Sequence, residues 1–230
     1  MKQPPSTRTA WRTLRALALG AGVLLAGMAG QVDGAPQLAE PVVTRIEHEY
    51  GDYALQRVEK WQAMIAAAGN MPEREKLETV NRFFNAMRFV SDAVLWGKED
   101  YWATPLETLL ANGGDCEDFS IAKYFTLRQA GVAQEKLRLT YVKALDLNQA
   151  HMVLMYFSTP GADPLVLDNL DKTIKPASMR KDLLPVYSFN AGGLWIARSQ
   201  GAEQHIGSSS RLSQWNAVIA RIGHEQLALR

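Results

Sequence analysis

Residues 113–120 read Gly-Gly-Asp-Cys-Glu-Asp-Phe-Ser and contain the only cysteine of this 230-residue chain, Cys116. A lone cysteine forms no internal disulfide, so its thiol is either a small buried hydrophobe or a reactive group. The Gly-Gly pair followed by an acid predicts a turn that opens a helix. The free amides and positive dipole end of a helix N-terminus favour a thiolate. The stretch therefore predicts a nucleophile at a helix start, with a structural cysteine as the alternative.

The chain around this stretch is predicted to be helical. Apolar residues recur at helical spacing before it, and the motif Thr104-Pro105-Leu106-Glu107 has the form of a capping box with proline at the first helical position. Gly131 is expected to end the helix that carries Cys116. The expected helices cover 41–68 (one or two helices), 72–87, 104–112 and 115–130.

After Gly131 the hydrophobic period changes from that of a helix to that of a strand. Ser209 or Ser210 is expected to cap a last amphipathic helix that runs through Ile222. Helices followed by an antiparallel meander indicate the α+β class. The expected strands cover 137–142, 151–157, 164–168, 186–189 and 194–197.

The N-terminus has the pattern of a secretion signal. A basic region precedes an unbroken run of small and apolar residues from Ala16 to Gly30, which is short for a membrane span. We expect a signal peptide over residues 1–35, cleaved near 30–35, and one domain over 36–230 exported to the periplasm. An uncleaved anchor is the alternative. The net charge of +1 and the lack of a basic run argue against a nucleic-acid partner.

Three residues supply the chemistry of a thiol nucleophile: Cys116 at a helix start, His151 near the start of a strand, and Asp168 at the end of the next strand. An imidazole takes the thiol proton and later protonates the leaving group, and a carboxylate orients the imidazole. Each residue also has a purely structural interpretation, since His151 can be a hydrogen-bonded core histidine and Asp168 a turn residue. Their order and their predicted elements together favour a catalytic triad.

The motif around Cys116, together with Asp100–Glu107, His151–Leu154 and Leu167–Asn169, resembles the bacterial transglutaminase-like cysteine proteinases. The resemblance extends from about Glu47 to Ile196. It implies a papain-like, transglutaminase-like fold, in which a helical lobe carries the nucleophile and packs on an antiparallel sheet that carries histidine and aspartate. Cys116, His151 and Asp168 match the triad of the family.

The resemblance also implies a biological role. Periplasmic members of this kind cleave the N-terminal region of large cell-surface adhesins and so promote biofilm dispersal. An inner-membrane receptor for cyclic di-GMP holds them inactive. The expected partners are therefore a surface adhesin as substrate and such a receptor as inhibitor.

Three carboxylates crowd the nucleophile, namely Asp115, Glu117 and Asp118. Their negative charge opposes thiolate formation unless a cation compensates it. Ca²⁺ takes carboxylate oxygens in flexible geometry, and the resemblance implies calcium dependence with Asp115 and Glu117 as ligands and Asp118 as a third. The alternative is that these acids only cap the helix and favour its dipole.

Trp102 precedes the nucleophile helix and is expected to help form the substrate cleft or the oxyanion pocket, with a core aromatic as the alternative. The sequence predicts a calcium-dependent endopeptidase. Two other functions stay open: an acyl transferase, which shares the thioester intermediate, and a non-enzymatic calcium-binding module that docks on a membrane receptor.

Overall fold

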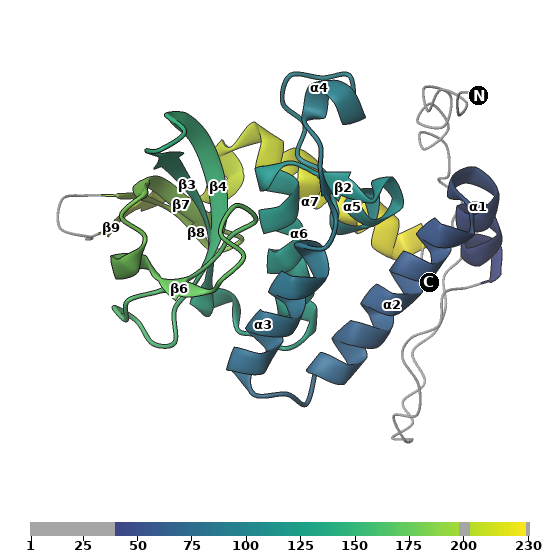
Figure 1. The fold of residues 1–230 in the computed structure, drawn as a ribbon, viewed down its shortest axis with the longest axis horizontal. Coiled ribbons are helices and arrows are strands. Elements are labelled where there is room, and N and C mark those ends of the chain that lie inside the picture. The colour runs from purple at the N-terminus through teal and green to yellow at the C-terminus, as the bar shows by residue number, and fades with distance from the viewer. Residues whose placement is uncertain (1–39, 198–202, 229–230) are drawn as a thin grey trace. The chain divides into compact units, whose positions relative to one another are not determined.

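Helices α1 to α6 precede a large antiparallel sheet, and a last helix follows it (Figure 1). The computed structural model describes residues 40–197 and 203–228. The helices are α1 (Glu40–Tyr50), α2 (Asp52–Ala68), α3 (Glu73–Phe84), α4 (Asp92–Leu95), α5 (Pro105–Ala111), α6 (Cys116–Gln129) and α7 (Ser213–Ala228). The strands are β1 (Arg88–Phe89), β2 (Gly113–Gly114), β3 (Leu137–Ala144), β4 (Gln149–Tyr156), β5 (Leu165–Leu167), β6 (Lys175–Pro176), β7 (Leu183–Asn190), β8 (Gly193–Ala197) and β9 (Glu203–Gly207).

The expected signal peptide lies outside the described residues, as does the expected domain boundary. Across residues 40–197 and 203–228, no helix combines the length and the apolar character needed to cross a bilayer.

The helical pattern over 41–68 forms two helices because the chain turns at Gly51, whose φ of 80° is a conformation that glycine adopts readily. Val58 and Trp61 of the predicted apolar stripe of α2 are buried in the core, whereas Tyr53 is 79 % exposed. Pro72 is the residue before α3 rather than its first helical residue. The short helix α4 was not predicted, because its four residues carry no repeating pattern.

The motif at Thr104 forms the predicted capping box. The Glu107 amide donates to Thr104 Oγ1 at 3.1 Å, and the Thr104 amide donates to Glu107 Oε2 at 2.8 Å. The chain then passes through Gly113 and Gly114 at very close approach. A Cβ on Gly114 would lie 2.4 Å from Asp118 Oδ2, so the turn before Cys116 accepts only glycine there.

The large sheet has the strand order β6-β5-β4-β3-β7-β8-β9, with every neighbouring pair antiparallel. The expectation of a simple meander is therefore wrong, because β7 returns to the centre of the sheet and pairs with β3. The five predicted strands are present as β3, β4, β5, β7 and β8, and the turn between β7 and β8 lies at Ala191-Gly192. Short β6, exposed β9 and the β1–β2 pair were missed, since none shows a regular alternation.

Helix α6 is the centre of the fold, because it packs on β3 and β4 and also contacts α3 and α5. Trp61 of α2 donates to Thr126 of α6 at 2.8 Å and ties the helices together. Trp215 of α7 stacks on Phe125 of α6 with 5.6 Å between ring centroids. The prediction that Ser209 or Ser210 caps this last helix is wrong: residues 209–211 form a separate 3₁₀ turn, and α7 begins at Ser213.

Candidate active site and metal centre

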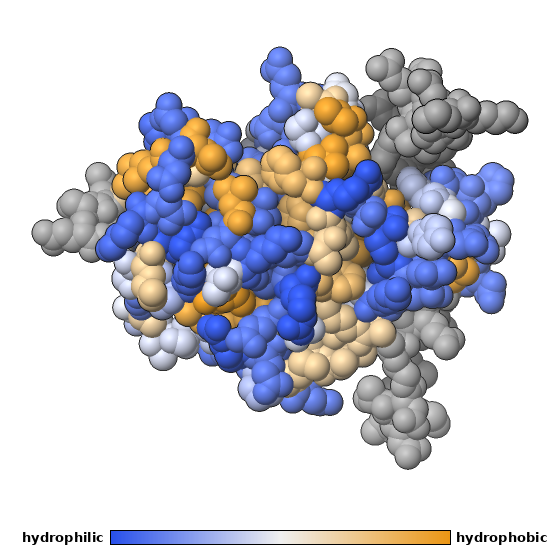
Figure 2. Space-filling model, viewed as in Figure 1, coloured by the Kyte–Doolittle hydropathy of each residue, from blue (hydrophilic) through white to orange (hydrophobic). Residues whose placement is uncertain are grey.

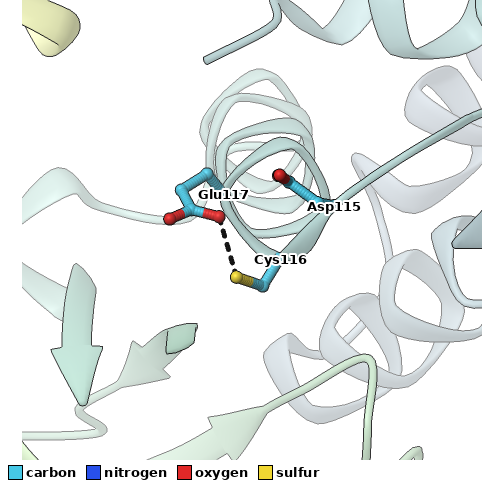
Figure 3. A group of neighbouring side chains, drawn as sticks. All are labelled: Asp115, Cys116 and Glu117. Carbon is cyan, nitrogen blue, oxygen red and sulfur yellow. Dashed lines mark hydrogen bonds between the residues drawn. The ribbon is translucent and has the colours of Figure 1, made fainter. Parts of the chain in front are cut away.

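Cys116 is the first residue of α6, directly after Asp115 at the N-cap. The Asp115 amide donates to the Asp118 carboxylate at 3.4 Å as part of a capping box that fixes this turn. The Cys116 thiol donates to Glu117 Oε2 at 2.7 Å, and Figure 3 shows the Glu117 side chain turned toward the sulfur. The backbone amide of Met152, on β4, also hydrogen-bonds to the sulfur.

This arrangement holds the Cys116 thiol in its protonated form. Burial raises the pKa of Cys116, and the neighbouring Glu117 and Asp115 carboxylates raise it further, whereas the Met152 amide acts in the opposite direction. A nucleophile here therefore needs a base for the thiol proton and positive charge to compensate the acids.

His151 and Asp168 form a buried hydrogen-bonded pair, and His151 is the neighbour in sequence of Met152, which contacts the thiol. His151 lies one residue before Met152 on β4, and Asp168 follows β5, which pairs with β4. His151 Nε2 lies 2.8 Å from Asp168 Oδ1, and the two side chains are 3 % and 0 % exposed. Because Nε2 faces the carboxylate, Nδ1 is the ring nitrogen left to accept a proton from a thiol.

Asp168 has hydrogen-bond partners in addition to His151. Its Oδ1 accepts from the Leu170 amide at 2.9 Å and its Oδ2 from Arg180 Nη2 at 2.7 Å, while Asn85 donates to its backbone carbonyl at 2.7 Å. Burial alone would raise the pKa of Asp168, but the His151 and Arg180 interactions outweigh it and hold the pKa below its usual range. Asp168 is therefore an ionised group in a fixed orientation.

We expect Arg180→Met to lower the free energy of unfolding by about 3 kcal/mol, because it leaves a buried carboxylate with one cation fewer. Arg180 is 4 % exposed and bridges Asp168 and Asp182. Urea denaturation measures the loss. Since the pKa of Asp168 is lowered in the folded state, its stabilisation is present at neutral pH and fades as the pH falls below about 4, so the difference between the two proteins narrows there.

The matched control is Arg180→Lys, which keeps the charge and loses the planar fork. It should lose less stability than the methionine variant. Equal stability of wild type and Arg180→Met at pH 7 would contradict a structural role for this pair.

Two groups of possible metal ligands include Cys116 or its neighbours in the sequence. Carboxylate oxygens of Asp92, Asp115 and Asp118 lie within 4.8 Å of one another, and ligand atoms of Asp115, Cys116 and Glu117 form a second group by the same criterion. The predicted residues Asp115, Glu117 and Asp118 are thus all near the thiol, but Asp118 and Glu117 belong to different groups. Asp92 was missed, because it reaches the cluster from α4 and no sequence spacing links it to the cysteine motif.

The group formed by Asp92, Asp115 and Asp118 fits a hard cation. Asp92 Oδ1 and Asp115 Oδ1 are buried and have no hydrogen-bond partner among the described residues. Burial raises the pKa of Asp92 to about 6 and that of Asp115 to about 7, with neighbouring carboxylates adding to both shifts. Burial and Asp115 also raise the pKa of Asp118 well above its usual range. Closely packed carboxylates with free oxygens are the donor set that Ca²⁺ takes.

Trp102 lies in the core. Its side chain is 6 % exposed and stacks on Phe189 at 5.6 Å, and its carbonyl accepts from Arg221. The next amide, of Ala103, donates to Asp118 Oδ1 at 2.7 Å. These contacts agree with the core-aromatic alternative, and the role of Trp102 in a substrate cleft or oxyanion pocket stays a prediction.

Comparison with known proteins places this geometry in context. The profile of the family described as bacterial transglutaminase-like cysteine proteinase, BTLCP, matches residues 49–184. The solved structure of EGTA-treated Legionella pneumophila LapG is 42 % identical, with a TM-score of 0.70, and the match covers 81 % of this chain and 99 % of that one. Calcium-bound Legionella pneumophila LapG is also 42 % identical, with a TM-score of 0.69 and coverage of 79 % and 98 %. Among curated proteins, none matches.

Proposed function

The chain belongs to the bacterial transglutaminase-like cysteine proteinases, with their α+β fold, and we propose that it is a calcium-dependent endopeptidase with Cys116, His151 and Asp168 as its triad. The observation that carries the proposal is the buried His151–Asp168 hydrogen bond, with His151 directly before Met152, whose backbone amide contacts the Cys116 thiol. His151 takes the thiol proton, and the sulfur attacks the scissile carbonyl carbon. The amine leaves with a proton from His151, and water then hydrolyses the thioester.

Calcium binding is proposed from the acid cluster and from the calcium-bound structure of a protein 42 % identical to this chain. Asp92, Asp115 and Asp118 would hold the ion, with Glu117 as a further ligand. The ion would supply positive charge that compensates the carboxylates raising the pKa of Cys116. Glu117 has two competing partners in this proposal, the thiol and the metal, which makes it the residue that links calcium to thiol activation.

Exposed apolar side chains would offer contacts to a peptide substrate. Val94 on α4 is 79 % exposed, and Leu147 and Leu184 near the turn between β3 and β4 are each 54 % exposed. Figure 2 shows apolar side chains gathered over these two parts of the surface. Tyr141 stacks on Tyr187 at 5.1 Å and lies near enough to Cys116 and Glu117 for their charges to raise its pKa, after burial as the main cause.

We further propose that the substrate is the N-terminal region of a large cell-surface adhesin, and that cleavage releases the adhesin and promotes biofilm dispersal. The protease would act in the periplasm, after removal of its signal peptide, under an inner-membrane receptor for cyclic di-GMP. The support for these proposals is the resemblance of the cysteine motif and the similarity to LapG.

The test uses the purified mature chain, calcium, and the N-terminal fragment of a large adhesin from the same organism. Mass spectrometry in H₂¹⁸O should find two fragments, with ¹⁸O in the new carboxyl terminus, because water completes the reaction. A parallel sample contains a dansylated primary amine. Amine incorporation without cleavage would identify an acyl transferase instead, and an unmodified adhesin fragment would leave only a calcium-binding module.

A further inference from the structure

Residues 97–104 join α4 to α5 and belong to no helix or strand, yet they contact both the acid cluster and the last helix. The amide of Tyr101 donates to Asp92 Oδ2 at 2.6 Å, and the amide of Ala103 donates to Asp118 Oδ1 at 2.7 Å. Asp92 and Asp118 are both buried, so the two bonds are shielded from water. Two backbone amides of this connecting segment therefore orient two of the three carboxylates proposed to hold calcium.

The carbonyls of the same two peptide groups face α7. Gln214 Nε2 donates to the Asp100 carbonyl at 3.1 Å and to the Asp100 carboxylate at 3.1 Å. Arg221 donates through Nη2 to the Trp102 carbonyl. A trans peptide group is planar and has its N–H and C=O on opposite sides. Each group is therefore held by α7 on one side and holds a carboxylate on the other, so both groups are rigid spacers between the helix and the acid cluster.

Arg221 makes two further contacts near this segment. Its Nε lies 3.4 Å from Glu107 Oε2, in the capping box of α5, and its Cζ lies 4.6 Å from the centroid of the Tyr101 ring. The Tyr101 hydroxyl donates to Glu107 Oε1 at 2.8 Å, so the tyrosine and the arginine share one carboxylate. One turn further along α7, Glu225 accepts from Thr104 Oγ1 at 2.6 Å. Arg221 thus fixes both the Tyr101 side chain and the carbonyl of the next residue.

These contacts decide which carboxylate oxygens are free for a cation. The Tyr101 amide takes Asp92 Oδ2, whereas Asp92 Oδ1 and Asp115 Oδ1 are buried and have no hydrogen-bond partner among the described residues. A free oxygen stays directed at a shared ion only while its carboxylate keeps the same rotation. Groups that hydrogen-bond to metal ligands provide this orientation. Helix α7 supports those groups in turn.

We propose that α7 is a clamp that positions Asp92 and Asp118 for calcium through the peptide groups 100–101 and 102–103, with Arg221 as the main positioning residue. The inference rests on the proposed function, since it takes these carboxylates as calcium ligands. Because coupling between two sites is reciprocal, calcium also tightens the contact of α7 with the connecting segment. The last helix therefore supports the metal centre, although none of its residues is among the proposed ligands.

Calcium titration by calorimetry tests the clamp without a substrate. Arg221→Met keeps much of the apolar length of the side chain and removes its contacts with the Trp102 carbonyl and Glu107. It should raise the Kd for calcium by about tenfold, as is common when a group that supports a metal ligand is lost. Arg221→Lys should recover part of the affinity, because it keeps a cation but not the planar fork that serves two acceptors.

Val218→Ala is the matched control. Val218 lies on α7 between the two contacting residues, is 0 % exposed, and packs in the hydrophobic core. It should lower the melting temperature through lost burial and leave the Kd for calcium within about twofold of the wild-type value. If Arg221 had only a structural role, Arg221→Met would likewise change the melting temperature and not the Kd, and that result would overturn the clamp.

Hydrogen exchange gives a readout that needs no calcium. In excess chelator, the Tyr101 and Ala103 amides of wild type should exchange slowly, because they donate to buried carboxylates. Arg221→Met should speed their exchange, and Val218→Ala should not. Added calcium should slow the exchange of α7 in wild type and have a smaller effect in Arg221→Met. Equal exchange of these amides in wild type and Arg221→Met would contradict the positioning role.

Should Arg221→Met fail to fold, Gln214→Leu tests the other peptide group from a partly exposed position. It should raise the Kd for calcium, and an unchanged Kd would overturn the clamp. The proposals fail in different ways. An adhesin fragment left intact by wild type, with the expected titrations, removes the protease function alone. Cleavage by wild type with equal calcium affinities of wild type and Arg221→Met removes the clamp alone. Wild type that cleaves but binds no calcium removes the calcium dependence and the clamp together.

Discussion

Cys116→Ala should fold, bind calcium and show no cleavage of the adhesin fragment. Removing the nucleophile eliminates the thioester route, so we expect the cleavage rate to fall by at least about 10⁴-fold. The change removes a thiol whose main polar contact is with Glu117, and it leaves Asp92, Asp115 and Asp118 in place. A cleavage assay on purified protein measures the loss, and calorimetry with calcium measures the retained binding.

Cys116→Ser is the matched control, since it keeps the shape and a polar atom but provides a much weaker nucleophile. It should also be inactive, with a melting temperature close to that of wild type. In cells, the culture supernatant of a wild-type strain should contain one large surface protein that the supernatant of the Cys116→Ala strain lacks. Cleavage that persists in the alanine variant would exclude Cys116 as the nucleophile.

A calcium chelator should reduce cleavage to background while Cys116 stays chemically intact. Without a cation, the Asp115 and Glu117 carboxylates raise the pKa of the buried thiol, and the population of thiolate falls. The melting temperature should fall as well, since an ion at 100 times its Kd stabilises the folded state by about 2.7 kcal/mol. Added calcium should restore both properties, and full activity in excess chelator would contradict the proposed dependence.

The stability of the chelated protein should depend on pH in a specific direction. Burial raises the pKa of Asp92 to about 6 and that of Asp115 to about 7, so the folded state binds protons that the unfolded state releases between about pH 4 and pH 7. Stability in chelator should therefore increase as the pH falls from 7 toward 4. Protons and calcium compete for the same oxygens, so the benefit of calcium should shrink over the same range.

Asp92→Asn tests whether calcium binds at the cluster of Asp92, Asp115 and Asp118 rather than elsewhere on the surface. It should weaken calcium binding and raise the calcium concentration needed for cleavage, because Asp92 contributes one of three neighbouring carboxylates. Glu99→Gln is the matched control, since it removes one charge from an exposed position in the segment that follows α4. In calcium titrations, the calcium concentration needed for cleavage should rise for Asp92→Asn and not for Glu99→Gln.

Features that depend on neighbours in the chain were predictable from the sequence. The capping box at Thr104 and Glu107 needs only residues three positions apart, and the helix at Cys116 follows from a glycine turn and an acid. The pairing of His151 with Asp168 was predictable because antiparallel strands that follow one another in the sequence bring their residues together. These parts of the site are set by local rules of capping and strand pairing.

Contacts between distant segments were not predictable in the same way. Asp92 enters the acid cluster from a short helix, and Arg180 reaches Asp168 from a segment with no regular pattern. The return of β7 to β3 depends on how the whole sheet closes, and the hydrophobic alternation of each strand is the same in either topology. Lys123 looked like an ordinary helix residue, because its burial follows from the packing of α6 on the sheet.

The order of the site residues along the chain also bears on when the site becomes reactive. A chain made from its N-terminus presents Cys116 first, then His151, then Asp168, and only afterwards Arg180 and the strand β7 that completes the middle of the sheet. A partly synthesised chain therefore holds Cys116 without the groups that are proposed to activate it. On the proposed mechanism, the thiol would become reactive only after Arg180 and β7 have been added to the chain.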